Sequence, residues 1–215
     1  MTEVEIRSGS PVEVRQAEDG TIRVSGHAAV FNQEANIAGL FRERFERGAF
    51  SDAIGRDDVV FLVNHDGLPL ARTRSGTLRL SEDAEGLRID AELDSNDPDV
   101  QALEPKLRRG DVDQMSIAFI PEVQEWDDTE DPPLRTISQA SLRDVSAVTH
   151  PAYEGTDIGL RALEDHKKRK ARENFHAARH RVRMKQKHLA RREREKGRNV
   201  AADSINTHTV EKDHE

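Results

Sequence analysis

Apolar and polar residues alternate along several short stretches of the chain, which is the pattern of half-buried β-strands. Residues 12–15 and 21–25 alternate in this way on either side of a turn sequence at residues 18–20. The alternation returns in residues 77–81 and 87–93, which a short polar segment ending in glycine separates. We therefore expect two β-hairpins in the first half of the chain.

One segment carries the start and stop signals of a helix instead. Asp97 is suited to cap a first turn, Pro98 fits the first helical position, and Gly110 follows a basic last turn. Pro105 lies inside the segment, where its missing amide N–H is expected to limit or kink the helix. We expect a helix over residues 96–110.

The remaining apolar stretches complete a mainly β pattern. Further strands are expected at residues 26–31, 59–66, 113–119, 135–137 and 142–148, with an acidic, proline-containing loop at 125–133. Many short strands with few helices indicate a mainly β protein of the α+β class. We expect a closed or nearly closed antiparallel β-barrel with a few helices packed outside it.

The charge of the chain is uneven along its length. The formal net charge is −8, but residues 165–198 hold 15 Lys and Arg against four acidic residues. The 164 residues before this stretch carry a net charge of −16, and the 17 residues after it carry −3. A basic tail on an acidic body is expected either to attract that body or to bind an acidic partner.

The change from an acidic to a basic stretch predicts that the chain has three parts. Residues 1–163 are expected to form the β-barrel domain. Residues 164–198 have only a narrow apolar stripe, which includes Phe175 and Val182, and we expect a basic helical tail there. Residues 199–215 are polar and are expected to be disordered.

Composition excludes several classes of site. The chain has no cysteine, which excludes disulfides, cysteine nucleophiles and cysteine-ligated zinc. Four of the nine histidines lie in the basic tail, where cation repulsion opposes metal binding, and no HExxH-type spacing occurs. No metal and no cofactor is therefore expected. No apolar run approaches the roughly 20 residues that span a bilayer, and the N-terminus lacks a signal-peptide pattern, so we expect a soluble protein made in a cytoplasm without a membrane partner.

Two reactive side chains stand in apolar stretches, His65 after residues 59–63 and Ser116 within residues 113–119. A serine hydroxyl becomes a good nucleophile when an imidazole takes its proton, and a third group orients that imidazole. Asp144 and His150 are both candidates for the third group. Each residue also has an ordinary structural explanation, because strand serines bond to the backbone and strand-end histidines suit turns. The residue types permit a serine hydrolase and leave the third member open.

Seven short motifs follow one another between residues 20 and 160. They are Gly26–Asn32, Glu46–Phe50, Val63–Asp66, Ser75–Leu78, Gly86–Leu87, Met115–Phe119 and Leu142–Tyr153. In this order and spacing, the series resembles the prohead (capsid maturation) serine proteases of tailed bacteriophages. The resemblance implies a fold related to herpesvirus assemblin, a seven-stranded β-barrel ringed by helices.

The resemblance also implies roles for individual residues. Ser116 matches the nucleophile and His65 the general base. Asp144 matches the acidic position of the seventh motif and is the favoured third member. The herpesvirus relatives use a second histidine in that role, which keeps His150 as an alternative. The oxyanion donor stays open between a backbone amide and an arginine such as Arg143.

The biology implied by the resemblance is specific. Such a serine endopeptidase works inside the immature procapsid in the host cytoplasm, where it cleaves the N-terminal delta segment of the major capsid protein, or the scaffold, and digests itself. Its expected partners are the major capsid protein, this scaffold or delta segment, and further copies of the chain. The basic tail has one aromatic residue, so any nucleic-acid binding is expected to be non-specific. The alternative function is a non-catalytic, scaffold-like assembly protein that binds the capsid protein.

Overall fold

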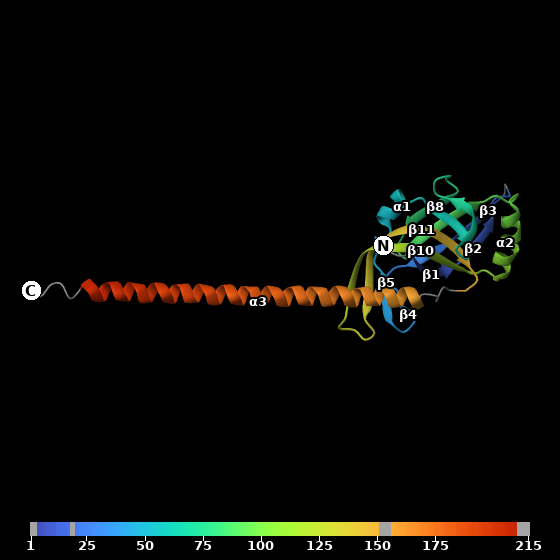
Figure 1. The fold of residues 1–215 in the computed structure, drawn as a ribbon. Helices are drawn as coiled ribbons and strands as arrows, with labels where there is room; N and C mark the ends of the chain where they lie inside the picture. Colours follow the sequence, from blue (N-terminus) through green and yellow to red (C-terminus); the bar gives the residue numbers. More distant parts are fainter. Residues whose placement is uncertain (1–3, 18–19, 151–155, 210–215) are drawn as a thin grey trace, which may run out of the picture. The chain divides into compact units, whose positions relative to one another are not determined.

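Two hairpins, each between strands that are close in sequence, build one of two sheets. A computed structural model describes residues 4–17, 20–150 and 156–209 (Figure 1). In this sheet β2 (Glu13–Gln16) pairs with β3 (Ile22–Val30), β3 with β9 (Gly86–Leu93), and β9 with β8 (Leu78–Glu82), all antiparallel. The two predicted hairpins are confirmed, and they join along β3 and β9 into a four-stranded sheet.

The second sheet has seven strands and joins segments that lie far apart in sequence. They are β1 (Glu5–Pro11), β4 (Ala35–Ile37), β5 (Phe41–Phe45), β6 (Val60–Val63), β7 (Asp66–Arg72), β10 (Gln114–Asp127) and β11 (Leu134–Val148). The order is β1-β10-β11-β5-β4, with β6 on β11 and β7 on β6. One end of β11 pairs in parallel with β5 and the other end with β6, while β10 runs antiparallel to β11 along its length. The long strand β11 therefore organises the sheet.

These two long strands differ from the sequence-based prediction. Residues 125–133 were expected to form a loop, but β10 continues to Asp127. Two separate strands were expected at 135–137 and 142–148, whereas β11 runs through the polar stretch between them, because pairing with β10 supports that stretch. Among the described residues, no strand pairing closes either sheet. The mainly β architecture with a few helices is confirmed, and the closed barrel stays a prediction.

Helix α2 (Pro98–Arg109) begins and ends at its predicted capping residues. The Asp97 carboxylate accepts a 2.8 Å hydrogen bond from the amide of Asp99, and Gly110 adopts a left-handed φ of 79° after the last turn. Pro105 does not end the helix, which continues through it to Arg109. Burial of one apolar face of α2 against the core stabilises the helix across this position.

The largest cluster of buried apolar side chains draws on both sheets, on α2 and on α1 (Ser51–Arg56). Phe45 of β5 packs 5.1 Å, between ring centroids, from Phe50 and from Phe119 of β10. Tilted aromatic pairs at this separation are favourable beyond the area that they bury. The core therefore fixes β5 and β10 against each other close to the strand region that carries Ser116.

The chain divides into two compact units, Met1–Leu163 and Glu164–Glu215. Helix α3 (Thr156–Thr209) contributes to both. Within the first unit, Leu163 packs with Ile37 and Phe41 in a small apolar cluster. The helix thus begins as part of the folded domain.

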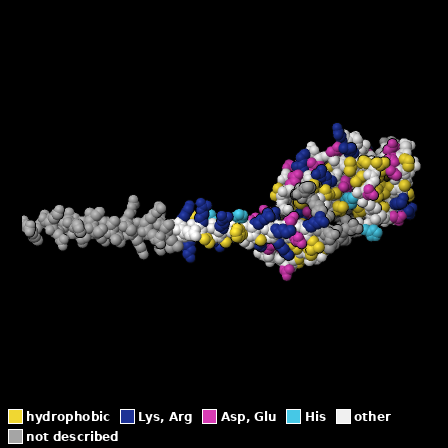
Figure 2. Space-filling model, in the orientation of Figure 1, with side chains coloured by type: hydrophobic (Ala, Val, Ile, Leu, Met, Phe, Trp, Pro, Cys, Tyr) yellow, Lys and Arg dark blue, Asp and Glu magenta, His cyan; other side chains and the backbone are white. Residues whose placement is uncertain are grey.

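The described residues of the second unit are the remainder of α3. Residues 164–188 hold ten Lys and Arg against three acidic residues, and Figure 2 shows basic and apolar side chains along this described part. Disorder was expected from residue 199, but the helix continues to Thr209, since neither Gly nor Pro interrupts residues 199–209; residues 210–215 lie outside the described part. In the ranges that the structure describes, no helix has the length and apolar character needed to cross a membrane.

Candidate active site

A tight turn between β6 and β7 presents His65. Val63 pairs with Asp66, so Asn64 and His65 are the two central residues of the hairpin. Both have positive φ values, 52° and 58°, as a type I′ turn requires. Two hydrogen bonds of Asn64 hold this turn against the end of β11. The backbone amide of Asn64 donates to the Ala147 carbonyl at 3.0 Å, and its side-chain oxygen accepts from the backbone amide of Thr149 at 3.0 Å. The histidine therefore has a fixed backbone position beside β11.

Ser116 and Asp144 come from the neighbouring strands β10 and β11. Ser116 lies directly opposite Ser146, and Ala118 lies opposite Asp144. The parallel pairing of β6 with β11 then brings the turn that follows β6 to the same face. A β-bulge interrupts the β10–β11 register just after the Ala118–Asp144 pair, and such bulges commonly re-aim side chains beside functional sites.

These three side chains form a continuous chain of hydrogen bonds. His65 Nε2 lies 2.8 Å from the Ser116 hydroxyl, and His65 Nδ1 lies 2.6 Å from Asp144 Oδ1. The side chains of His65 and Asp144 are 12% and 13% exposed, so water screens their interaction only weakly. This arrangement is able to move a proton from the hydroxyl to Nε2 while the carboxylate holds the imidazole at Nδ1.

Ser146 is a member of the site that the sequence did not single out. Its hydroxyl donates to Asp144 Oδ1 at 2.9 Å and accepts from the backbone amide of His65 at 3.2 Å. It is completely buried and lies opposite Ser116. The available signal was its spacing, since residues two apart in a strand face the same side. Ser146 therefore links the Asp144 carboxylate to the turn that carries His65 through two hydrogen bonds.

The other candidates from the sequence lie apart from this chain of hydrogen bonds. His150 is exposed, and its Nδ1 lies 3.2 Å from the Thr149 hydroxyl. Arg143 is the extra residue of the β-bulge in β11 and is exposed. Residues 151–155, which include the end of the seventh motif, lie outside the described part. Among the described residues, no cluster of His, Asp or Glu is arranged to hold a metal ion.

Strand β1 covers the Ser116 hydroxyl. Ser8 pairs with Ser116 in the β1–β10 register, and the Ser116 hydroxyl donates a 2.9 Å hydrogen bond to the Arg7 carbonyl. Ser116 has no exposed surface. The reactive group is thus in contact with a peptide carbonyl of the chain itself.

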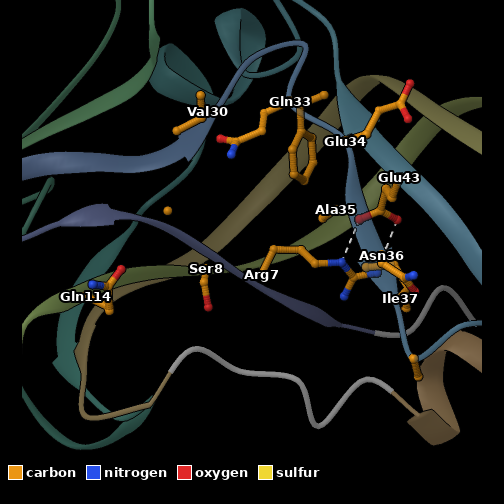
Figure 3. Close-up of a pocket in the computed structure, with 13 residues that line it drawn as sticks. Arg7, Ser8, Val30, Gln33, Glu34, Ala35, Asn36, Ile37, Glu43 and Gln114 are labelled. Atoms are coloured by element: carbon orange, nitrogen blue, oxygen red, sulfur yellow. Dashed lines mark hydrogen bonds and ion pairs between the residues drawn. The ribbon is translucent and has the colours of Figure 1, made fainter.

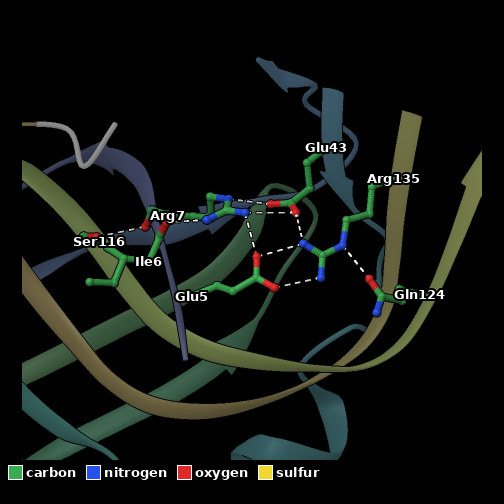
Figure 4. Close-up of polar contacts among 7 residues, drawn as sticks. All are labelled: Glu5, Ile6, Arg7, Glu43, Ser116, Gln124 and Arg135. Atoms are coloured by element: carbon green, nitrogen blue, oxygen red, sulfur yellow. Dashed lines mark hydrogen bonds and ion pairs between the residues drawn. The ribbon is translucent and has the colours of Figure 1, made fainter. Parts of the chain in front are cut away.

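A buried network of four charged residues holds this part of β1 (Figure 4). Arg7 donates to Glu43 at 2.6 and 3.1 Å and to Glu5 at 2.8 Å, while Arg135 donates to both carboxylates at 2.8 Å. Burial acts to raise the pKa of Glu5, but hydrogen bonds and charge from Arg135 and Arg7 outweigh it and lower the pKa. Two acids and two bases balance one another, which is the condition for keeping charges in a protein interior.

One family of known proteins matches most of the chain. Residues 10–170 match the family of the Caudovirus prohead serine proteases. No curated protein matches. The solved capsid assembly protease gp21 of bacteriophage T4 is similar at 12% identity with a TM-score of 0.48, over 69% of this chain and 98% of that one; so distant a likeness adds nothing to the assignment. Because the family match spans well over half of its residues, the chain belongs to the Caudovirus prohead serine proteases.

Proposed function

We propose that this protein is a serine endopeptidase in which Ser116 is the nucleophile, His65 the general base and Asp144 the residue that orients His65. The observation that carries the proposal is the pair of short contacts at the two ring nitrogens of His65, 2.8 Å to Ser116 and 2.6 Å to Asp144. His150 makes no described contact with any of the three, which favours Asp144 as the third member.

In this mechanism the Ser116 oxygen attacks the carbonyl carbon of a peptide bond while its proton passes to His65 Nε2. The Asp144 carboxylate stabilises the imidazolium that forms, and Ser146 holds that carboxylate in place. The proton then passes to the leaving amine, and water, activated by the same histidine, hydrolyses the acyl-enzyme ester. Stabilisation of the oxyanion completes the mechanism, with a backbone amide or Arg143 as the donor.

We further propose that the substrates are the N-terminal delta segment of the major capsid protein, or the scaffold, and the enzyme itself, inside the procapsid of an infected host cell. Membership of the prohead protease family supports this. The basic part of α3 is proposed to recruit the enzyme to an acidic capsid or scaffold segment, and to bind nucleic acid only through non-specific charge attraction. An assemblin-like closed barrel is proposed for the first unit.

Expression of the wild type and of Ser116→Ala, each with the capsid protein, tests the function. We expect intact-mass analysis to show fragments of the enzyme and of the capsid protein with the wild type, and intact chains with the variant. Circular dichroism of the variant should match the wild type, since only one buried oxygen is lost. Equal fragmentation by the two proteins would refute the assignment. A well-folded wild type that binds the capsid protein without cleaving it would favour the scaffold-like alternative.

A further inference from the structure

The position of β1 carries an inference that rests on the proposed function and names its regulation and its substrate class. We propose that β1 is an internal substrate mimic: it occupies the strand position that a substrate takes on β10, keeps Ser116 latent, and is replaced by substrates that carry a basic residue at the position of Arg7. The family match begins at residue 10, so most of β1 precedes the matched residues.

The first support is the contact at the nucleophile. The Ser116 hydroxyl has one hydrogen and two acceptors within reach, the Arg7 carbonyl at 2.9 Å and His65 Nε2 at 2.8 Å. While the hydrogen points to Arg7, it is not available to the general base. The same carbonyl fills the space that a substrate carbonyl must enter, and Ser116 has no surface left for another molecule. β1 thus blocks the site by space and by hydrogen bonding.

The second support is the way in which β1 is held. Its two buried side chains are Glu5 and Arg7, both charged, and none of its residues belongs to the buried apolar core. No buried apolar side chain leaves the core with β1, although the strand lies against the backbone of β3 at Gly9 and Arg7 covers the ring of Phe119. A cavity of about 380 Å³ also borders Arg7, Ser8 and Gly9 on one side of the strand (Figure 3). An antiparallel strand attached by backbone pairing and polar contacts is the kind that another extended peptide is able to replace.

The third support is the charge that remains when β1 leaves. Glu43 and Arg135 stay paired at 2.8 Å, and Arg135 still donates to Gln124 at 2.6 Å. Departure of Arg7 frees a place for a cation beside Glu43, and departure of Glu5 frees a place for an anion beside Arg135. Figure 4 shows Arg7 and Glu5 in these two places. A substrate strand in the same register therefore presents a basic residue whose carbonyl meets Ser116, and an acidic residue two positions earlier gains a partner in Arg135.

The latency is tested by the rate at which diisopropyl fluorophosphate labels Ser116, followed by intact mass. Arg7→Glu places a third carboxylate beside Glu5 and Glu43, and we expect it to label at least about tenfold faster than the wild type, equivalent to about 1.4 kcal/mol. The matched control is Arg15→Glu, the same charge change on a β2 side chain that is 79% exposed, and it should label at the wild-type rate. Ser116→Ala identifies the labelled residue. A folded Arg7→Glu protein that labels at the wild-type rate would overturn the latency.

A second variant tests the latency of Ser116 if Arg7→Glu does not fold. Ile6 and Ala118 are direct partners in the β1–β10 register, and the chain has no cysteine of its own. In Ile6→Cys/Ala118→Cys, a disulfide or a short thiol bridge locks β1 in place, and reduction or omission of the bridge frees it. The locked form should label at least about tenfold more slowly than the free form of the same protein. Equal rates for the two forms would overturn the proposal.

The substrate class is tested with two peptides that copy β1, Glu-Ile-Arg-Ser-Gly and the same peptide with Gln for Arg, each extended by flanking residues. On the Arg7→Glu protein, or on the free cysteine variant, we expect kcat/KM to be at least about tenfold higher for the arginine peptide. Equal values would remove Glu43 as the selecting residue. Failure of every variant to label or to cleave would refute the proposed function instead, so the two failures are distinguishable.

Discussion

Replacing Asp144 by asparagine changes one atom of the hydrogen-bond chain and leaves its shape intact. Asp144 Oδ1 accepts from His65 Nδ1 at 2.6 Å and from the Ser146 hydroxyl at 2.9 Å. If the amide oxygen takes the Oδ1 position, both donors stay satisfied but the negative charge is gone. If the amide nitrogen takes it, His65 must accept at Nδ1 and carries its proton at Nε2, where it is unable to receive the proton of Ser116.

The smaller loss of cleavage rate is expected when the amide oxygen takes the Oδ1 position. An imidazolium and a carboxylate with charge centres about 4 Å apart attract each other by about 4 kcal/mol at an effective dielectric constant of about 20. Loss of this attraction in the transition state lowers the rate by about 10³-fold. The second case adds the wrong tautomer, for which a loss of about 10⁴-fold is the known scale in serine proteases. We therefore expect Asp144→Asn to lower the cleavage rate by about 10³ to 10⁴-fold.

The assay is the time course of self-cleavage and of capsid-protein cleavage by intact mass, with Ser116→Ala as the baseline. His150→Ala is the matched comparison, because His150 is the other candidate and is exposed. It should stay within about threefold of the wild type, as surface substitutions away from a site usually do. An active Asp144→Asn protein together with an inactive His150→Ala protein would refute the assignment and make His150 the third member.

Three further outcomes are expected. Ser146→Ala should lower the cleavage rate by about 10 to 100-fold, since a hydrogen bond to a charged group contributes about 1.5–3 kcal/mol; a rate within twofold of the wild type would contradict its positioning role. Arg135→Met should lower the free energy of unfolding in urea by about 3–5 kcal/mol, because it leaves two buried carboxylates with one cation; an unchanged urea midpoint would contradict this. The hydrogen bond from His27 and the amides of Gly86 and Glu85 lower the pKa of Asp83 to about 2, so its contribution to stability is present above pH 4 and is lost as the pH falls toward 2. Asp83→Asn should therefore show a smaller loss of stability between pH 4 and pH 2 than the wild type, and equal losses would argue against the shift.

Elements with local signals could be predicted from the sequence. The hairpin of β8 and β9 follows from period-two alternation around a short turn, and α2 follows from Asp97 and Gly110 at its ends. These signals concern residues that are near each other in the sequence. The continuity of β11 was missed because its polar middle, residues 138–141, is supported by pairing with a distant strand.

The site could be predicted only in part. His65 and Ser116 stand out as polar residues in apolar stretches, but the residues alone did not place them together, and the family resemblance did. The choice between Asp144 and His150 depends on the parallel pairing of β6 with β11, for which no local pattern exists. The contact of Arg7 with Ser116 was not predicted, because it joins residues 109 positions apart through a backbone carbonyl that any residue type supplies.

That separation has a consequence during synthesis. β11, the last of the described strands, contributes Asp144, while β1, the first of them, has no strand partner on the ribosome until β10 has emerged. A nascent chain that lacks the residues of β11 therefore has no complete proteolytic machinery to damage proteins around it. Pairings across such long separations also predict slow folding, so a newly made copy has no complete site until these distant strands have paired.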